Sequence, residues 1–232
     1  MGEMGRAFDG SYAEYVLLPN EQIYPVHTDL DWTTLAAIPE TYYTAFGSLQ
    51  QLRIAPQDRV LVRSAGSGVG VAFAQLLKAQ FPHIVLHGST RNPAKATRLQ
   101  AVGFDEVITE ADGKLQTDQR YDKILELVGP ATLRDSFSHI NEHGIVCNTG
   151  QLGNIWCVND FDPIIELKNN SYLTAFYSGN VSQAKLDAMF DYIRQLNVKI
   201  LIERVFTLEQ VPEAHRFLQS ADGFGKVVVV NE

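Results

Sequence analysis

The sequence predicts an α/β fold in which helices cover both faces of a parallel β-sheet. From about Asp58 onward, short β-branched runs alternate with longer segments whose apolar residues recur at helical spacing. This alternation favours a doubly wound parallel sheet, because each crossover helix returns the chain to the same edge of the sheet. The length of 232 residues suits one large domain or one and a half.

The first half of the alternating region contains three predicted strands and two predicted helices. A helix over Val69–Gln80 has its apolar residues on one face and a lysine in its last turn. A second helix begins at Pro93, which suits the first turn, and ends at Gly103, which suits a C-terminal cap. The predicted strands are Arg59–Arg63, Ile84–Leu86 and Val107–Ile108.

The second half continues the alternation to the end of the chain. The most regular helix is Gln183–Leu196, which has a clean amphipathic face. The other predicted helices are Ala131–Ile140 and Leu208–Ser220. The predicted strands are Lys123–Val128, Ile145–Asn148, Tyr172–Tyr177, Ile200–Phe206 and Val227–Val230.

The first 57 residues do not show this alternation. They contain a predicted strand, Tyr12–Leu18, and a region, Thr33–Leu52, that is largely helical despite Pro39. We therefore expect a second, smaller unit and a connecting helix in front of the sheet.

A glycine-rich loop, Ser64–Gly70, follows the first strand directly and opens a helix. Small residues let a backbone approach the pyrophosphate of a dinucleotide, and the helix N-terminus offers unpaired N–H donors. A glycine cluster alone could be a structural turn, but the strand–loop–helix–strand context favours a Rossmann-type dinucleotide site. The candidate pyrophosphate contacts are Ser67, Gly68, Val69 and Gly70.

The end of the second strand indicates which dinucleotide is bound. NAD selectivity usually needs an acid near this point, and none occurs before Asp105. Arg91 and Lys95 could instead surround the 2′-phosphate of NADPH, with Ser89 and Thr90 donating hydrogen bonds. The alternative is that Arg91 and Lys95 are solvated residues at the start of a helix. The sequence therefore favours NADPH as the cofactor.

Several stretches match one family in order and spacing: Gly10–Tyr15, Ala36–Ala45, Val60–Val62, Gly68–Gly70, Val128–Gly129, the strand that ends at Gly150, and Gly225–Val228. Together they span nearly the whole chain. On these stretches the chain resembles the medium-chain dehydrogenase/reductase superfamily, in particular its zinc-independent quinone oxidoreductase branch. The resemblance implies transfer of a hydride from NADPH to a quinone or an activated alkene or carbonyl compound.

The resemblance also implies roles for individual residues. Thr44 corresponds to a threonine that contacts the nicotinamide side, and Ser89, Arg91 and Lys95 correspond to 2′-phosphate contacts. Strand ends that line the cofactor correspond to Val128, Gly129, Asn148 and Gly150.

The chain departs from the family pattern at two places. Ser67 stands where the family usually has a glycine, and most of an N-terminal GroES-like β lobe is missing. We expect a remnant of that lobe at 1–30, the NADP-binding Rossmann domain at 31–198 and a return to the lobe at 199–232. The short front end leaves open a fragment of a longer alcohol dehydrogenase-like enzyme, or an NADP-binding module without catalysis of its own.

No metal site is predicted. His139, Glu142 and His143 match the HxxEH pattern of some zinc peptidases, but they lie where a helix ends before a buried strand. Glu40 stands where the resemblance would place a cysteine ligand of zinc, and the segment that supplies the other ligands is missing.

Composition limits the partners. A net charge of −8 argues against nucleic acid, and neither a membrane span nor a secretory signal is recognisable, so we expect a cytoplasmic protein. We expect a small-molecule substrate. The apolar segment Gly153–Val158 could form an open edge strand that pairs with a second copy, which predicts a homodimer.

Overall fold

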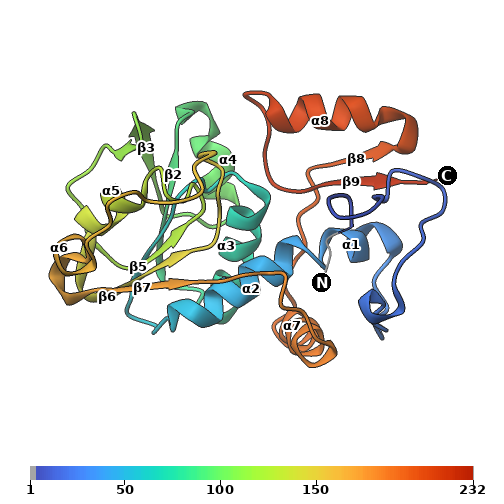
Figure 1. The fold of residues 1–232 in the computed structure, drawn as a ribbon, viewed down its shortest axis with the longest axis horizontal. Helices are drawn as coiled ribbons and strands as arrows, with labels where there is room; N and C mark the ends of the chain where they lie inside the picture. The colour runs from blue at the N-terminus through green and yellow to red at the C-terminus, as the bar shows by residue number, and fades with distance from the viewer. Residues whose placement is uncertain (1–3, 232) are drawn as a thin grey trace.

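A seven-stranded, mainly parallel sheet forms the larger part of the molecule in the computed structural model, which describes residues 4–231 (Figure 1). Its strand order is β4-β3-β2-β1-β5-β6-β7, so the chain runs outward from β1 in both directions. The strands are β1 (Arg59–Val62), β2 (Val85–Thr90), β3 (Glu106–Ala111), β4 (Lys114–Leu115), β5 (Tyr121–Glu126), β6 (Ile140–Asn148) and β7 (Tyr172–Ala175). Ligands of such sheets bind at the carboxyl ends of the strands, at the point where the order reverses.

Helices cover the two faces of the sheet and divide its core into two clusters. α2 (Thr41–Leu52), α3 (Gly68–Gln80) and α7 (Gln183–Gln195) pack on one face, and α5 (Leu133–Ser138) packs on the other. Alternate residues of a strand point to opposite faces, and Val60 and Val62 accordingly join the first cluster whereas Leu61 joins the second. This arrangement confirms the predicted α/β fold with a doubly wound parallel sheet.

A smaller unit lies beside the sheet (Figure 1). Its two strands, β8 (Arg204–Thr207) and β9 (Val227–Val230), pair in parallel, and α8 (Val211–Gln219) connects them. α1 (Trp32–Ala37) packs against β9.

The remaining short helices of the chain are η1 (Asn20–Gln22), η2 (Pro93–Lys95), α4 (Ala96–Ala101), α6 (Pro163–Glu166), η3 (Lys168–Asn170) and η4 (Leu208–Gln210). The division of the chain into a lobe remnant at 1–30, a Rossmann domain at 31–198 and a return to the lobe at 199–232 stays a prediction.

Two predicted strands are wrong. Tyr12–Leu18 is not a strand, because no neighbouring strand pairs with it; this stretch is held by side-chain contacts such as Tyr12 Oη to His215 Nε2 at 3.0 Å. Gly153–Val158 is a turn followed by irregular chain, and the edge strands of the sheet are β4 and β7. The homodimer therefore stays a prediction without the strand on which it was based.

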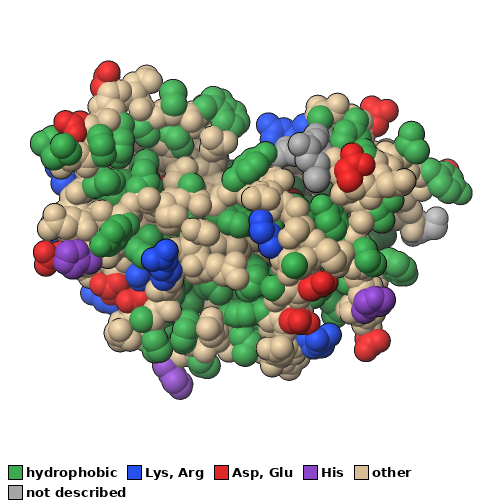
Figure 2. Space-filling model, turned by 60° about the horizontal axis from the view of Figure 1, so that its bottom comes forward, with side chains coloured by type: hydrophobic (Ala, Val, Ile, Leu, Met, Phe, Trp, Pro, Cys, Tyr) green, Lys and Arg blue, Asp and Glu red, His purple; other side chains and the backbone are tan. Residues whose placement is uncertain are grey.

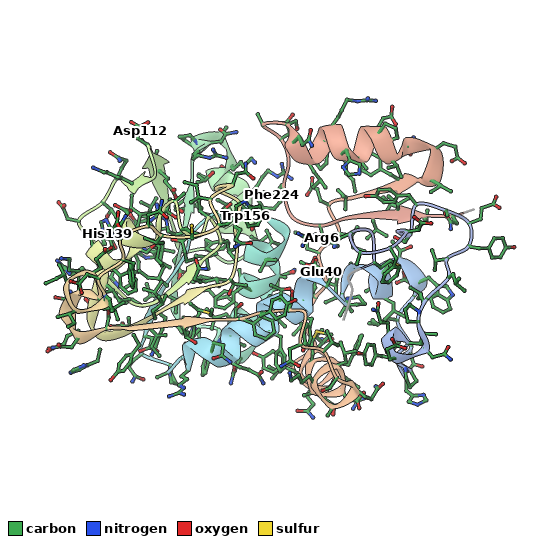
Figure 3. The ribbon with its side chains drawn as sticks, in the orientation of Figure 1. Arg6, Glu40, Asp112, His139, Trp156 and Phe224 are labelled. Carbon is green, nitrogen blue, oxygen red and sulfur yellow. The ribbon has the colours of Figure 1, made fainter. Side chains whose placement is uncertain are left out.

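The predicted helix over Thr33–Leu52 is two helices with a break around Pro39. Proline lacks the N–H that would continue the hydrogen-bond ladder, so α1 ends before it and α2 begins after it. The break places Glu40 at the junction of α1 and α2, as Figure 3 shows.

The surface keeps several large apolar side chains. Figure 2 shows hydrophobic groups spread over one face, and Leu17 and Trp32 are among the most exposed in the chain. Within residues 4–231, no helix combines the length and the apolar character that crossing a membrane would require.

Candidate functional site

A pocket of about 430 Å³ lies between the carboxyl ends of the strands and the smaller unit. It joins the glycine-rich loop, the first turns of α2, the loop after β6 and the start of β9. Thr44, Ser67, Gly68, Val69 and Gly150, all predicted from the sequence, line it together. The other lining residues are Glu40, Thr41, Leu127, Thr149, Gln151, Leu152, Ser178, Leu218, Gly225, Lys226 and Val227.

The glycine-rich loop leaves helix N–H groups free for a ligand. Ser67 caps α3 by accepting from Gly70 N at 3.2 Å, and its backbone is extended, at φ −71° and ψ 162°. A serine therefore fits here without strain, although the family usually has glycine. Within residues 4–231 no acceptor takes the N–H of Gly68 or Val69, so both remain available for an anion.

Two glycines of the predicted site are required by close backbone approach. A Cβ on Gly70 would lie 2.6 Å from the carbonyl oxygen of Ala65, so only glycine lets α3 start this close to the loop. Gly129 has a φ of +92°, and a Cβ there would lie 2.5 Å from the oxygen of Gly150. These positions hold the loops after β1, β5 and β6 against one another.

Lys226 supplies a positive charge to the pocket. Its Nζ donates to Thr41 Oγ1 at 2.8 Å and lies 4.0 Å from Glu40 Oε2. Burial lowers the pKa of this ammonium, and Glu40 partly opposes the shift. The sequence analysis assigned no role to Lys226. The feature that could have pointed to this residue is the Gly-Lys pair just before the final valine-rich strand.

The far end of the pocket carries neutral polar groups. Thr44 Oγ1 donates to the Glu40 carbonyl at 2.8 Å, which leaves its lone pairs for a donor on a ligand. Thr149, which the sequence interpretation missed, shares a 2.9 Å hydrogen bond with Ser48. Nearby in the chain, Asn148 Oδ1 is buried and has no hydrogen-bond partner within the described residues.

The predicted adenosine end lies outside this pocket. Arg91 is exposed and has no hydrogen bond or ion pair within residues 4–231, whereas Lys95 Nζ donates to the Gly223 carbonyl. Thr90 Oγ1 accepts from Asn92 N at 3.1 Å within the turn. Ser89 is fully buried and donates to Glu110 Oε2 at 2.9 Å, so its contact with a 2′-phosphate stays a prediction that this geometry does not favour.

A buried charge cluster lies beneath the strand ends. Arg63, which is fully buried, contacts Glu110 at 2.9 Å, Asp135 at 2.8 Å and Glu126 at 3.8 Å. The same guanidinium donates to the Gly113 carbonyl at 3.0 Å. The cluster thus joins β1, the β3–β4 hairpin, β5 and α5.

Glu126 connects this cluster to the predicted cofactor loop. Its Oε1 accepts from the N–H of Val128 at 2.8 Å and of Gly129 at 3.0 Å, and its Oε2 accepts from Ser136. Burial raises the pKa of this carboxyl, and Arg63 partly opposes the shift. One side chain therefore fixes the backbone after β5.

We expect Glu126→Gln to change how stability depends on pH. A raised pKa in the folded state gives stability that is complete below the unfolded value of 4.5 and is lost as pH rises through the folded value. The wild type should therefore lose stability relative to the variant as the pH rises above 4.5 through the raised folded-state pKa of Glu126. Melting temperatures of both proteins across pH 4–8 would check this, and a constant difference would contradict it.

The donor set does not fit a zinc centre. Among residues 4–231, no group of three His, Cys, Asp or Glu side chains is arranged to hold a metal ion. Of the residues that the structure describes, Glu40 is the one carboxylate that lines the pocket, and its ion-pair neighbour at 4.0 Å is Lys226, a cation. His139 precedes β6, and its Nδ1 donates to the Gln119 carbonyl at 3.1 Å. His143 is exposed within β6, so the HxxEH residues do not share a helix turn.

The same pocket does fit a nicotinamide dinucleotide. It offers free helix N–H groups and one lysine for a pyrophosphate, then hydroxyl groups and glycine backbone toward the strand ends. A second hollow of about 450 Å³ between α2, β7 and α7 has one charged side chain, Lys185, whose Nζ donates to the Asn180 carbonyl. It offers no comparable anion site.

Comparison with known proteins agrees with the geometry. A family model described as zinc-binding dehydrogenase matches residues 102–229. The quinone oxidoreductase of Pongo abelii is 26% identical over 231 residues, which cover 95% of this chain and 69% of that protein. The fold matches Bacillus subtilis protein yhfP with NAD bound, at a TM-score of 0.79 and 24% identity over 97% of this chain and 71% of that one.

A third match is Escherichia coli protein YHDH with NADPH bound. Its TM-score is 0.81 at 16% identity, over 97% of this chain and 72% of that one. The chain therefore spans only part of these relatives: 69% of the quinone oxidoreductase and 71% and 72% of the two solved structures.

Proposed function

The chain belongs to the zinc-binding dehydrogenase family, and from this premise we propose that it is a nicotinamide-dependent oxidoreductase that reduces a quinone or an activated alkene or carbonyl compound. The observation that carries the proposal is the pocket that combines the glycine-rich loop, Lys226 and Thr44. When bound, the nicotinamide supplies the hydride, and the protein supplies binding and orientation.

The chain's own residues would bind the dinucleotide in two places. The N–H groups of Gly68 and Val69 and the ammonium of Lys226 would hold the pyrophosphate. All three are hydrogen-bond donors that line the pocket, and Lys226 also carries a positive charge. Thr44 would orient the nicotinamide side by accepting a hydrogen bond. Gly150 lets the loop after β6 approach the backbone at the end of β5, since a Cβ there would lie 2.0 Å from the Leu127 carbonyl oxygen.

NADPH is the proposed cofactor because of the charges at the end of β2. Burial and the neighbouring charge of Arg98 lower the pKa of Lys95, Asp222 partly opposes the shift, and Arg91 adds to it, so three cations lie near this turn. Within residues 4–231 no carboxylate lies within salt-bridge distance of Arg91 or Lys95. A 2′-phosphate would supply the missing negative charge.

The test is a fluorescence titration of the purified chain with NADPH and NADH, followed by a simple quinone in the same sample. Tighter binding of NADPH with oxidation of the cofactor supports the proposal. Binding without turnover would support the alternative, a cofactor-binding module, and would overturn the proposed reductase. Binding of neither dinucleotide would overturn the cofactor site itself.

The variant Arg91→Ala tests the cofactor preference directly. We expect the NADPH dissociation constant to rise about fivefold, because one exposed charged contact is worth about 1 kcal/mol. The NADH dissociation constant should stay unchanged, since NADH has no 2′-phosphate. Arg194→Ala on α7, also an exposed arginine, is the matched control. An equal loss for both cofactors would contradict the preference.

A further inference from the structure

A short segment between α8 and β9, Ala221–Gly225, lies against the Rossmann domain at the predicted adenosine end; we name it the strap. Three side chains that follow β2 hold its carbonyl groups. Asn92 Nδ2 donates to Ala221 at 3.2 Å, Arg98 Nη1 donates to Asp222 at 3.3 Å, and Lys95 Nζ donates to Gly223. The strap thus contacts the same turn that would receive a 2′-phosphate.

Arg98 makes the most contacts in this region. Its guanidinium lies 4.2 Å from the centre of the Phe224 ring and 2.6 Å from Glu203 Oε1. Phe224 is buried in the main core, so the stack fixes the strap against α4. A guanidinium can stack on a ring and form hydrogen bonds in its plane at the same time, which a lysine ammonium cannot do.

The other end of the strap reaches the cofactor pocket. Gly225 N donates to the Gly66 carbonyl at 3.0 Å, and Gly225 and Lys226 line the pocket. Figure 3 shows Phe224 on the side of the strap toward α4 and Glu40 on the side of α1 and α2. The strap therefore runs from the adenosine end of the site to the pyrophosphate end.

From these contacts we propose that Arg98 is a positioning residue for cofactor selection. It fixes the strap, and the Gly223 carbonyl of the strap holds the Lys95 ammonium at the end of β2. A lysine side chain is flexible, so a fixed acceptor reduces the freedom that it would lose when it binds a phosphate. The inference rests on the proposed function, because it concerns the 2′-phosphate that distinguishes NADPH from NADH.

The experiment measures dissociation constants of NADPH and NADH for Arg98→Met, Arg98→Lys and Lys95→Met by fluorescence titration. Lys95→Met should weaken NADPH about tenfold, because it removes a charged hydrogen-bond donor. Both Arg98 variants should weaken NADPH about three- to fivefold, since neither can stack on Phe224 and bond the strap together. NADH should change by less than about twofold, because Lys226 keeps its own hydrogen bond to Thr41.

Arg98→Lys separates positioning from charge. If Arg98 acted only through its positive charge, the lysine variant would bind NADPH like the wild type, and the proposal would be overturned. Arg194→Lys on α7 is the matched control. Arg98 is partly exposed, so both variants should fold, and unchanged melting temperatures would show this.

Hydrogen exchange gives a readout that does not depend on a cofactor. The amide of Gly225 should exchange faster in both Arg98 variants than in the wild type, because the strap is no longer fixed. Unchanged exchange at Gly225 would overturn the positioning role. If Lys95→Met weakens NADPH while the Arg98 variants do not, the inference fails and the proposed function stands. If the wild type binds neither cofactor, the proposed function fails.

Discussion

Replacing Arg63 by methionine should lower the free energy of unfolding by about 3–5 kcal/mol, because it removes the cation from a buried cluster of carboxylates. Arg63 and Glu126 are fully buried, and the Glu110 side chain is only 5% exposed. Without Arg63 these carboxylates must either remain charged in a low-dielectric interior or take up protons. Urea unfolding at pH 7 would measure the loss.

The loss should become smaller as the pH falls. Burial raises the pKa of the Glu126 carboxyl, so this group is readily protonated as the pH falls, and the stability of Arg63→Met should then approach that of the wild type. Arg59→Met, at the start of the same strand, is the matched control, because Arg59 bonds Gln119 and no buried carboxylate. A stability within about 1 kcal/mol of the wild type at pH 7 would contradict the importance of the cluster.

The Arg63 cluster also shows what the sequence could not predict. The strand Arg59–Arg63 is recognisable from its β-branched residues, but nothing near Arg63 in the sequence indicates a buried partner. Its partners lie on β3, β5 and α5, and only the strand order brings them together. Long-range pairing of charges leaves no periodic signal in a sequence.

Elements with local signals were predicted well. The glycine-rich loop and its helix, the alternating strands and the helix near Gln183–Leu196 all depend on spacing within one segment, and the structure has each of them. Tyr12–Leu18 has the composition of a strand but no partner strand, and strand formation depends on pairing. Local composition therefore predicts this strand wrongly.

The candidate site was predicted in the same uneven way. Thr44 on α2, Gly68 at the start of α3 and Gly150 after β6 belong to stretches with clear motif signals, and they meet in one pocket. Ser89 has the right position in the chain, but its hydroxyl points to Glu110 because that carboxylate lies on the neighbouring strand. Lys226 reaches the pocket only because β9 returns beside α1.

Replacing Lys226 by methionine should raise the dissociation constants of both NADPH and NADH by about 10- to 100-fold, since a hydrogen bond to a charged group contributes about 1.5–3 kcal/mol. Lys226 is the one cation among the residues that line the pocket. Both cofactors carry the pyrophosphate, so the loss should be equal for the two. This equal loss separates Lys226 from Arg91 and Lys95, whose replacement should affect NADPH alone.

Methionine keeps the length and the apolar stem of the lysine, so the packing of β9 should survive. Lys199→Met, at an exposed position in the same smaller unit, is the matched control and should leave both affinities unchanged. Fluorescence titration of the two variants at fixed ionic strength would measure the effect, because salt screens charged contacts. If Lys226→Met bound both cofactors like the wild type, the pyrophosphate would have to be held by the N–H groups of Gly68 and Val69 alone. The pocket would then bind the dinucleotide through backbone groups, and the 2.8 Å bond from Lys226 to Thr41 would be structural only.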